Sequence, residues 1–390
     1  MKANRIIRPT MATAMPSAGT RDRLISLDVF RGATIAAMIL VNNPGSEYAF
    51  GPLRHAEWNG WTLTDLIFPF FLFIVGVSLV LSTASRVARG ESKRSLARHA
   101  LRRAAIIFAI GLFLGGFPHF ALATWRIPGV LQRIAICYFI AAVLFLWTGP
   151  KVRWAIIAAC LIGYWVMMRF VPVPGFGVPG VDIPLLDPDR NLVAWFDRKL
   201  MMGHLYERVR DPEGVLSTIP SIATCLLGVA TGEWVRRFRG DGMALVRRLL
   251  VVGAIAVALG EAWGTFFPIN KKLWTSSYAL LVGGLAMLVL AVCYWLMDVR
   301  GWKGKWTTPA LVFGTNAIVV YAFAELIAIL GFSYPITVGG RHESWQQILY
   351  AALFSKLPPE WGSLAFSILF LMICFVPVWV MWKKKIFVKV

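Results

Sequence analysis

The chain has 390 residues, 58% of them hydrophobic, and a formal net charge of +20. Soluble domains have about 45–50% apolar residues, so this composition, with a mean hydropathy of +0.65, excludes an ordinary soluble protein. The positive charge would fit a nucleic-acid-binding protein, but the cations lie in short segments between apolar runs. That distribution is typical of the cytoplasmic loops of membrane proteins, and we expect no nucleic-acid partner.

Apolar runs recur along nearly the whole chain, each long enough for a helix to cross a hydrocarbon core of about 30 Å. Lipid offers the backbone no hydrogen bonds, so such runs must be helical. The sequence therefore predicts an all-α, polytopic transmembrane helical bundle with both termini in the cytoplasm. We expect about ten spans, at residues 26–45, 62–83, 101–118, 128–148, 153–171, 215–235, 247–267, 273–297, 308–331 and 361–382.

Clustered cations identify the segments that face the cytoplasm. They fill two segments between spans and the C-terminus: Arg86, Arg89, Lys93, Arg94, Arg98, Arg102 and Arg103; Arg236, Arg237, Arg239, Arg247 and Arg248; Lys383, Lys384, Lys385 and Lys389. The outward segments then include the long loop 172–214, in which residues 191–205 predict a short interfacial helix. We expect residues 1–24 to be a disordered cytoplasmic tail and residues 25–390 to form a single transmembrane domain.

The five cysteines all lie within apolar segments and have no metal-ligand spacing: Cys137, Cys160, Cys225, Cys293 and Cys374. Buried thiols of this kind act as small hydrophobic side chains. We therefore predict neither disulfides nor a metal site.

The residues best suited to chemistry lie around the first two spans. His55 sits in the polar segment Arg54–Gly60 between them, and a histidine there is either a general base or an ordinary interfacial residue. Asp65, near the start of the second span, is placed to orient its ring. Asn42 ends the first span, where an amide either caps the helix or donates to a carbonyl that gains negative charge.

Further polar and aromatic residues gather at the same outer level. Trp58 is either a belt residue or a platform for a sugar ring, and Arg133, just inside lipid, is expected to face the bundle interior. Asn316 and Glu325, within the ninth predicted span, suit hydrogen bonds between helices. The candidate substrate-binding residues are Trp58, Asn59, Arg126, Gln132, Arg133, His204, Asn270 and Lys271.

Long motifs in the sequence resemble the heparan-α-glucosaminide N-acetyltransferase family. The resemblance covers nearly the whole chain from about residue 24, through Ser26–Gly32, Val41-Asn42, His55–Thr62, Asp65–Phe71, Arg126–Arg133, Asp211–Gly214, Pro268–Tyr278 and Asn316. It implies transfer of an acetyl group from cytosolic acetyl-CoA to the amine of a glucosamine residue across the membrane. The family's catalytic histidine is matched by His55, and its active-site asparagine by Asn42.

One departure from the family concerns the acceptor. The animal enzyme has an added lumenal N-terminal portion with a further span that this sequence lacks, so we expect a relative from a bacterial inner membrane. Heparan itself is then not the expected acceptor, which we describe as an amino sugar or glycan end. Membrane lipid is the other expected partner, and a homodimer is compatible with the sequence.

The resemblance implies acetyl-CoA as co-substrate, with its anionic nucleotide at the basic cytoplasmic face. Arg31, Arg102, Arg103 and Asn316 are the candidates for binding it. His55 would take a proton from the sugar amine while Asn42 stabilises the oxyanion, or it would carry an acetyl group itself; the residues alone do not decide. Two other functions fit in part: an O-acyltransferase of an envelope glycan, and a secondary transporter.

Overall fold

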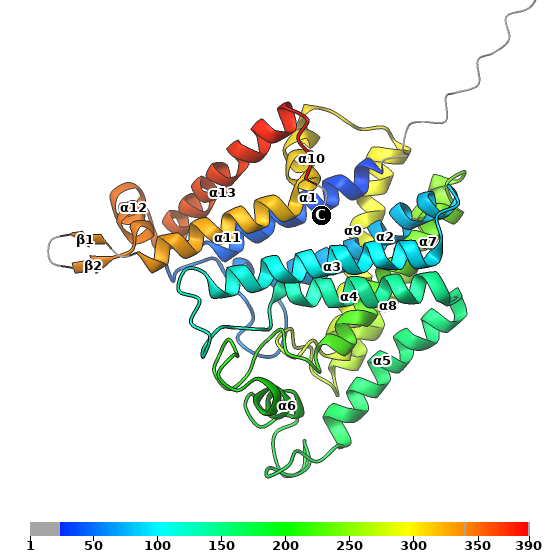
Figure 1. Ribbon diagram of the computed structural model, residues 1–390, viewed down its shortest axis with the longest axis horizontal. Coiled ribbons are helices and arrows are strands. Elements are labelled where there is room, and N and C mark those ends of the chain that lie inside the picture. Colours follow the sequence, from blue (N-terminus) through cyan, green and yellow to red (C-terminus); the bar gives the residue numbers. More distant parts are fainter. Residues whose placement is uncertain (1–23, 335, 339–340, 389–390) are drawn as a thin grey trace, which may run out of the picture.

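The computed structural model describes residues 24–334, 336–338 and 341–388, and they form a bundle of helices with one small hairpin (Figure 1). This confirms the all-α class; the predicted tail, residues 1–24, lies almost wholly outside the described residues. The α-helices are α1 Ile25–Asn42, α2 Ile67–Val87, α3 Lys93–Gly116, α4 Val130–Trp147, α5 Pro150–Phe170, α6 Leu192–Met201, α7 Thr218–Arg237, α8 Gly242–Gly264, α9 Ser276–Tyr294, α10 Thr308–Thr315, α11 Ala317–Ser333, α12 Trp345–Phe354 and α13 Pro359–Lys383. The antiparallel strands are β1 Ile336–Val338 and β2 Arg341–Glu343.

Membrane-spanning helices are confirmed by length and composition. In the described part of the chain, eight helices are long and apolar enough to cross a bilayer, and the bent pair α10–α11 makes a ninth. They correspond to nine of the predicted spans, and the protein is therefore an integral membrane protein. Helix α7 is not among them because its threonines, serine and glycines lower its hydropathy. Ten spans and cytoplasmic termini stay predictions.

Helix α1 lies between two hydrophobic clusters. Its first turns, with Leu27 and Phe30, belong to a large cluster built from α2, α3, α4, α5, α7, α8 and α9. Its later turns, with Ile35 and Ile39, belong to a smaller cluster with α10, α11 and α13. In Figure 1 α10 and α13 lie above α1, α11 runs across it, and α3, α4, α5 and α8 lie below it. The core is thus divided, and α1 joins its two parts.

Glycines let α1 and α10 approach backbone to backbone. A Cβ atom at Gly32 would lie 1.7 Å from the Ala310 carbonyl oxygen, and one at Gly314 would lie 2.2 Å from the Asp28 carbonyl oxygen. Arg31 closes the contact, since its Nε donates to the Gly314 carbonyl (2.7 Å) and its NH2 pairs with Asp28 Oδ1 (2.5 Å). The helix end of α10 is therefore capped by a cation, as the helix dipole favours.

The ninth predicted span is broken. Residues 305–315 and 317–331 meet at an angle of 77°, with Asn316 at the break. The buried amide of Asn316 binds the C-terminal segment: its Nδ2 donates to the Ile386 carbonyl (3.1 Å), and its Oδ1 accepts from the Val388 N–H (2.9 Å). The Asn316 side chain thus ties the break to a returning segment of the same chain.

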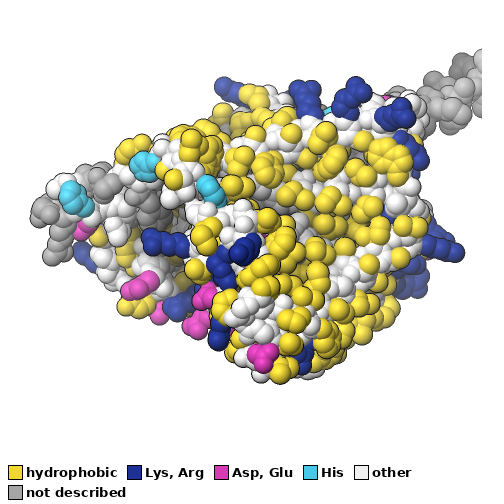
Figure 2. All heavy atoms as spheres, turned by 60° about the horizontal axis from the view of Figure 1, so that its bottom comes forward, with side chains coloured by type: hydrophobic (Ala, Val, Ile, Leu, Met, Phe, Trp, Pro, Cys, Tyr) yellow, Lys and Arg dark blue, Asp and Glu magenta, His cyan; other side chains and the backbone are white. Residues whose placement is uncertain are grey.

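The surface fits a bilayer. Figure 2 shows hydrophobic side chains across the middle of one face, Lys and Arg along its top and right edges, and Asp, Glu and His toward the left and bottom, with further Lys and Arg among them. Helices α3, α5, α8 and α13 each bury only 28% of their most apolar window, so much of their apolar surface faces outward. That surface is the one available to lipid.

Candidate active site

Two connecting segments at one end of the bundle hold each other in place. They connect α1 to α2 and α8 to α9, and they are joined by the Gly60 N–H, which donates to the Ile269 carbonyl (2.8 Å). The buried amide of Asn270 donates to the Trp58 carbonyl (2.9 Å) and to Asn59 Oδ1 (3.2 Å). These bonds hold Lys271, the residue after Asn270, next to the segment that carries His55.

His55, Asp65 and Lys271 form one contact group. His55 Nδ1 lies 2.7 Å from Asp65 Oδ1, and Lys271 Nζ lies 3.0 Å from the same nitrogen and 3.3 Å from the same oxygen. The histidine side chain is 50% exposed, whereas Asp65 is 1% exposed. A buried carboxylate thus orients a histidine that solvent and substrate can reach.

The Asp65 carboxylate is fixed from several directions. Its Oδ2 accepts from the N–H groups of Ala56 and Thr62 (both 3.0 Å) and from the Thr62 hydroxyl (3.2 Å). The Tyr278 hydroxyl donates to the Asp65 carbonyl (2.5 Å). An ionised carboxylate only accepts, so we assign the Nδ1 proton to His55, which leaves Nε2 to act as a base. The Lys271 ammonium, which only donates, then pairs with Asp65 and makes no hydrogen bond to that nitrogen.

Lys271 is a largely buried cation beside His55 and Asp65. Burial lowers the pKa of Lys271, while the neighbouring Asp65 carboxylate raises it, and the net shift is downward. The side chain nevertheless keeps 21% of its surface exposed. A partly accessible lysine with a lowered pKa is a feature of functional sites.

A second charged group surrounds Arg126. Its guanidinium donates to both carboxylate oxygens of Asp211 (2.9 and 2.7 Å) and to Glu213 Oε2 (2.5 Å), and it stacks 4.5 Å from the Tyr206 ring centroid. Burial lowers the pKa of Arg126, but the hydrogen bonds that it donates to Asp211 and the charge of Glu213 raise it above its usual value. Arg126 therefore holds the loop before α7 against the start of α4.

Three further candidates bind protein groups near Arg126. His204 Nδ1 lies 2.8 Å from the Trp125 carbonyl, and Gln132 Nε2 donates to the Ile127 carbonyl (3.0 Å). Arg133 is 1% exposed and donates through NH2 to the Gly214 carbonyl (3.0 Å), while its Nε and NH1 lack partners among the described residues. The expected inward orientation of Arg133 is confirmed.

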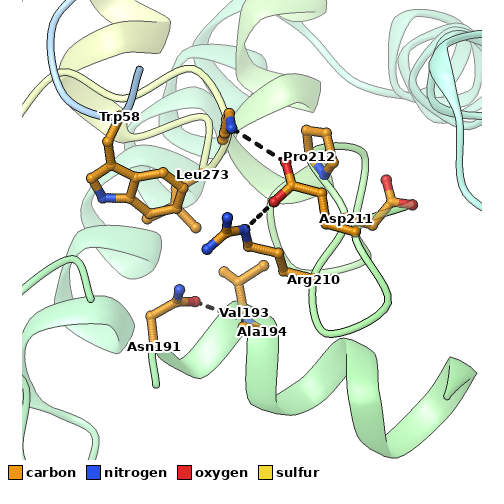
Figure 3. Close-up of a pocket in the computed structure, with 10 residues that line it drawn as sticks. Trp58, Asn191, Val193, Ala194, Arg210, Asp211, Pro212 and Leu273 are labelled. Atoms are coloured by element: carbon orange, nitrogen blue, oxygen red, sulfur yellow. Dashed lines mark hydrogen bonds and ion pairs between the residues drawn. The ribbon is translucent and has the colours of Figure 1, made fainter. Parts of the chain in front are cut away.

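Trp58 lines a small pocket together with residues of α6 and of the loop that follows it. Its Nε1 donates to the Leu186 carbonyl (2.8 Å), and the ring centroid lies 5.2 Å from the Arg210 guanidinium carbon and 5.8 Å from Lys272 Nζ. Figure 3 shows the indole beside Arg210, above Val193 and Ala194 of α6. Glu207 pairs with both cations, and these charges lower its pKa although burial acts to raise it. The indole is packed against cations in this arrangement.

The remaining candidates are not brought to His55 by any hydrogen bond. Asn42 is exposed at the end of α1, and the adjacent Asn43 caps that helix by donating to the Ile39 carbonyl (2.8 Å). On the opposite side of the bundle, Arg102 is exposed, and Arg103 stacks 5.1 Å from the Tyr138 ring centroid. The Arg103 Nε is buried without a partner among the described residues.

Sequence reasoning did not assign several residues that complete the site. Asp211 and Glu213 lie in a quoted motif, but their pairing with Arg126 spans more than 80 residues and has no local signal. Tyr278, in another quoted motif, binds the Asp65 carbonyl across 213 residues, and Glu207, outside the motifs, pairs with Arg210 nearby and with Lys272 across 65 residues. No group of three or more metal-ligand side chains occurs in the described ranges.

The fold and these contacts define a polytopic helical membrane protein with an oriented histidine at one mouth of its bundle. The chain belongs to the heparan-α-glucosaminide N-acetyltransferase family: the family model described as "Heparan-alpha-glucosaminide N-acetyltransferase, catalytic" matches residues 23–261. The proteins of that name from Mus musculus and Homo sapiens are 33% and 34% identical, over 359 and 357 residues. Both matches cover 78% of this chain, which spans about half the length of these relatives (54% and 53%).

Proposed function

We propose that this protein is a transmembrane acetyltransferase of a bacterial inner membrane. It transfers an acetyl group from cytosolic acetyl-CoA to the amine of a glucosamine-type sugar at the outer face, with residues 25–390 acting as one domain. The observation that carries the proposal is the 2.7 Å contact between His55 and Asp65, with Lys271 beside it, in a chain of this family.

His55 is the proposed general base. Its Nε2 takes a proton from the amine as the nitrogen attacks the thioester carbonyl, and it returns that proton to the departing CoA thiolate. Asp65 stabilises the imidazolium that forms between these steps, as a buried carboxylate does when it accepts from Nδ1. Asn42, exposed and without a hydrogen-bond partner among the described residues, is the proposed donor to the oxyanion.

A second scheme uses the same histidine as a nucleophile. His55 then accepts the acetyl group, and the amine attacks acetyl-His55. Rapid quenching after labelled acetyl-CoA alone separates the two schemes, since a covalently labelled protein forms only in the second.

The basic side of the bundle suits the nucleotide of CoA. Arg102 is exposed there, and the unpaired Nε of Arg103 is a buried donor that an anion would satisfy. Arg31 and Asn316 are also proposed for CoA. Arg31 binds the Gly314 carbonyl at the end of α10, and Asn316 binds the C-terminal segment, so both would act by holding these segments in place.

The test uses purified protein in liposomes, with labelled acetyl-CoA on the basic side and sugars on the other side. We expect labelled N-acetylglucosamine from glucosamine, and no product from glucose. Product from glucose alone would indicate O-acylation. Transport of the sugar without consumption of acetyl-CoA would indicate a transporter. Either result would overturn the proposal.

A further inference from the structure

The ammonium group of Lys271 lies directly beside the proposed base. Nζ is 3.0 Å from His55 Nδ1 and 3.3 Å from Asp65 Oδ1, and 21% of the side chain is exposed. The amide of the preceding residue, Asn270, donates to the Trp58 carbonyl (2.9 Å) and so fixes the backbone at this point. Because Nδ1 and Nε2 share one small ring, Nζ also lies within a few ångströms of the nitrogen that takes the proton.

This ammonium group has donors that the protein does not use. A lysine carries three N–H donors, and Asp65 Oδ1 accepts one of them. His55 Nδ1 carries its own proton in the assigned tautomer and therefore accepts none. In the described ranges no other group forms a hydrogen bond or ion pair with Nζ. The remaining donors are thus left for solvent or a ligand.

The position of this cation is unfavourable for the base taken alone. His55 becomes positive when it takes up a proton, and a like charge a few ångströms away disfavours that form. Asp65 does not need the lysine for its orientation, since its Oδ2 already accepts from the N–H groups of Ala56 and Thr62. A cation here helps the reaction only if a negative charge develops beside it in the same step.

Acetyl transfer supplies that negative charge. As the amine nitrogen bonds to the thioester carbon, the π electrons of the carbonyl move onto its oxygen, and His55 Nε2 takes the amine proton. The oxyanion then re-forms the carbonyl, the C–S bond breaks, and the imidazolium gives its proton to the CoA thiolate. Reacting atoms approach within about 3–3.5 Å, so the oxyanion forms close to the imidazolium. Asp65 faces the positive charge, and the unused donors of Lys271 are available to the negative one.

We propose that Lys271 donates a hydrogen bond from its ammonium group to the thioester carbonyl oxygen and stabilises the oxyanion that forms there. The inference rests on the proposed function and adds a catalytic residue to it. Lys271 keeps its proton throughout, and it supplies a charge that the neutral amide of Asn42 does not. The role is the same in both schemes, because the carbonyl oxygen gains negative charge whether the amine or His55 attacks.

The first test measures the carbonyl stretching frequency of bound acetyl-CoA, ¹³C-labelled at the carbonyl, by infrared difference spectroscopy. A hydrogen bond from a cation polarises the carbonyl and lowers this frequency. The intact, purified wild type is compared with Lys271→Met, Asp65→Asn and Lys199→Met, the last removing an exposed lysine of α6. We expect a higher frequency in Lys271→Met and the wild-type value in Lys199→Met. Asp65→Asn should keep most of the wild-type shift, because Lys271 acts on the oxygen directly.

Kinetics give a second readout. Lys271→Met should lower kcat by about 100- to 1,000-fold with little change in KM for either substrate, because the interaction strengthens only in the transition state. Lys271→Arg keeps a charged donor and should recover part of the rate. Lys271→Gln keeps a neutral donor and should give an intermediate carbonyl frequency, which provides the same test if the Met variant does not fold.

Two results would overturn the inference: a wild-type carbonyl frequency in Lys271→Met, or an equal rise in Lys271→Met and Asp65→Asn. The second result would mean that Lys271 acts only through the carboxylate. The infrared measurement needs no turnover, so its outcome stands apart from the proposed function. A wild type whose bound thioester depends on Lys271 but that does not acetylate glucosamine would refute the function and leave this contact intact.

Discussion

Nδ1 of His55 lies 2.7 Å from Oδ1 of Asp65, although one side chain is half exposed and the other is buried. A short 3₁₀ turn, Thr64–Leu66, carries Asp65 at the entrance to α2. The segment between His55 and Asp65 turns at Gly60, whose φ is +94°. Residues with a side chain rarely adopt this backbone conformation. Local backbone geometry therefore positions the base and the residue that orients it.

Replacing Asp65 by Asn should reduce kcat/KM by about 100- to 10,000-fold, because the amide neither stabilises the imidazolium nor fixes the tautomer. The assay is acetyl transfer to glucosamine, with acetyl-CoA binding measured in parallel to show that the protein remains folded. Glu57→Gln is the matched control, since this exposed acid lies two residues from His55 and should retain activity. Equal activity of both variants would remove Asp65 from the mechanism.

Lys271 should set the alkaline limit of activity. Because burial lowers the pKa of Lys271 below the usual 10.5, raising the pH removes its charge, and with it the ion pair to Asp65, earlier than for an exposed lysine. The folded state also holds this proton less tightly than the unfolded chain, so the group costs stability at neutral pH, and the cost disappears toward pH 10.5.

The corresponding measurement is a pH profile of kcat/KM. In Lys271→Arg the guanidinium stays charged, so the alkaline limb should move to higher pH, whereas Lys272→Arg should leave it in place. An alkaline limb that does not move in Lys271→Arg would exclude Lys271 as its origin.

Arg126→Gln should destabilise the protein by about 3–5 kcal/mol, because it leaves the fully buried Asp211 carboxylate without its cation. Thermal unfolding in detergent measures the effect. Arg190→Gln, which breaks the more exposed pair with Asp187, should change the melting temperature far less. Similar losses in both variants would mean that the Arg126 group does not anchor the loop.

The glycine contact between α1 and α10 gives a prediction about packing. Gly32→Ala places a methyl group 1.7 Å from a backbone oxygen, so the helices must separate, at a cost of about 1–3 kcal/mol or more. Gly163→Ala in α5 meets no atom within 4 Å and should stabilise the helix by about 0.5–1 kcal/mol. Opposite shifts in melting temperature would support the contact, and equal shifts would contradict it.

Hydropathy predicted the helices well because each span must bury or expose an apolar surface along its whole length. Hydropathy did not predict features that an average over a whole span conceals. Residues 308–331 are apolar throughout, so the break at Asn316 depends on its hydrogen bonds to the C-terminal segment. Helix α3 begins at Lys93, capped by Ser92, rather than at residue 101, because its basic first turns carry no hydropathy signal.

The site was predictable where its residues are neighbours in sequence. His55 and Asp65 are ten residues apart and flank one turn, so their pairing follows from the sequence. The partners of Arg126 are 85 and 87 residues away, and those of Asn270 more than 200. Such contacts depend on how the loops at this end of the bundle pack together, which no local pattern encodes.

The central claim is that His55 is the base for acetyl transfer to an amine. The most direct measurement follows labelled N-acetylglucosamine formed from acetyl-CoA and glucosamine by wild type, His55→Ala and His119→Ala, the last removing an exposed histidine on the same side. The account predicts product from wild type and from His119→Ala, and a loss of at least about 100-fold in His55→Ala with acetyl-CoA binding retained. Normal rates in His55→Ala would contradict it.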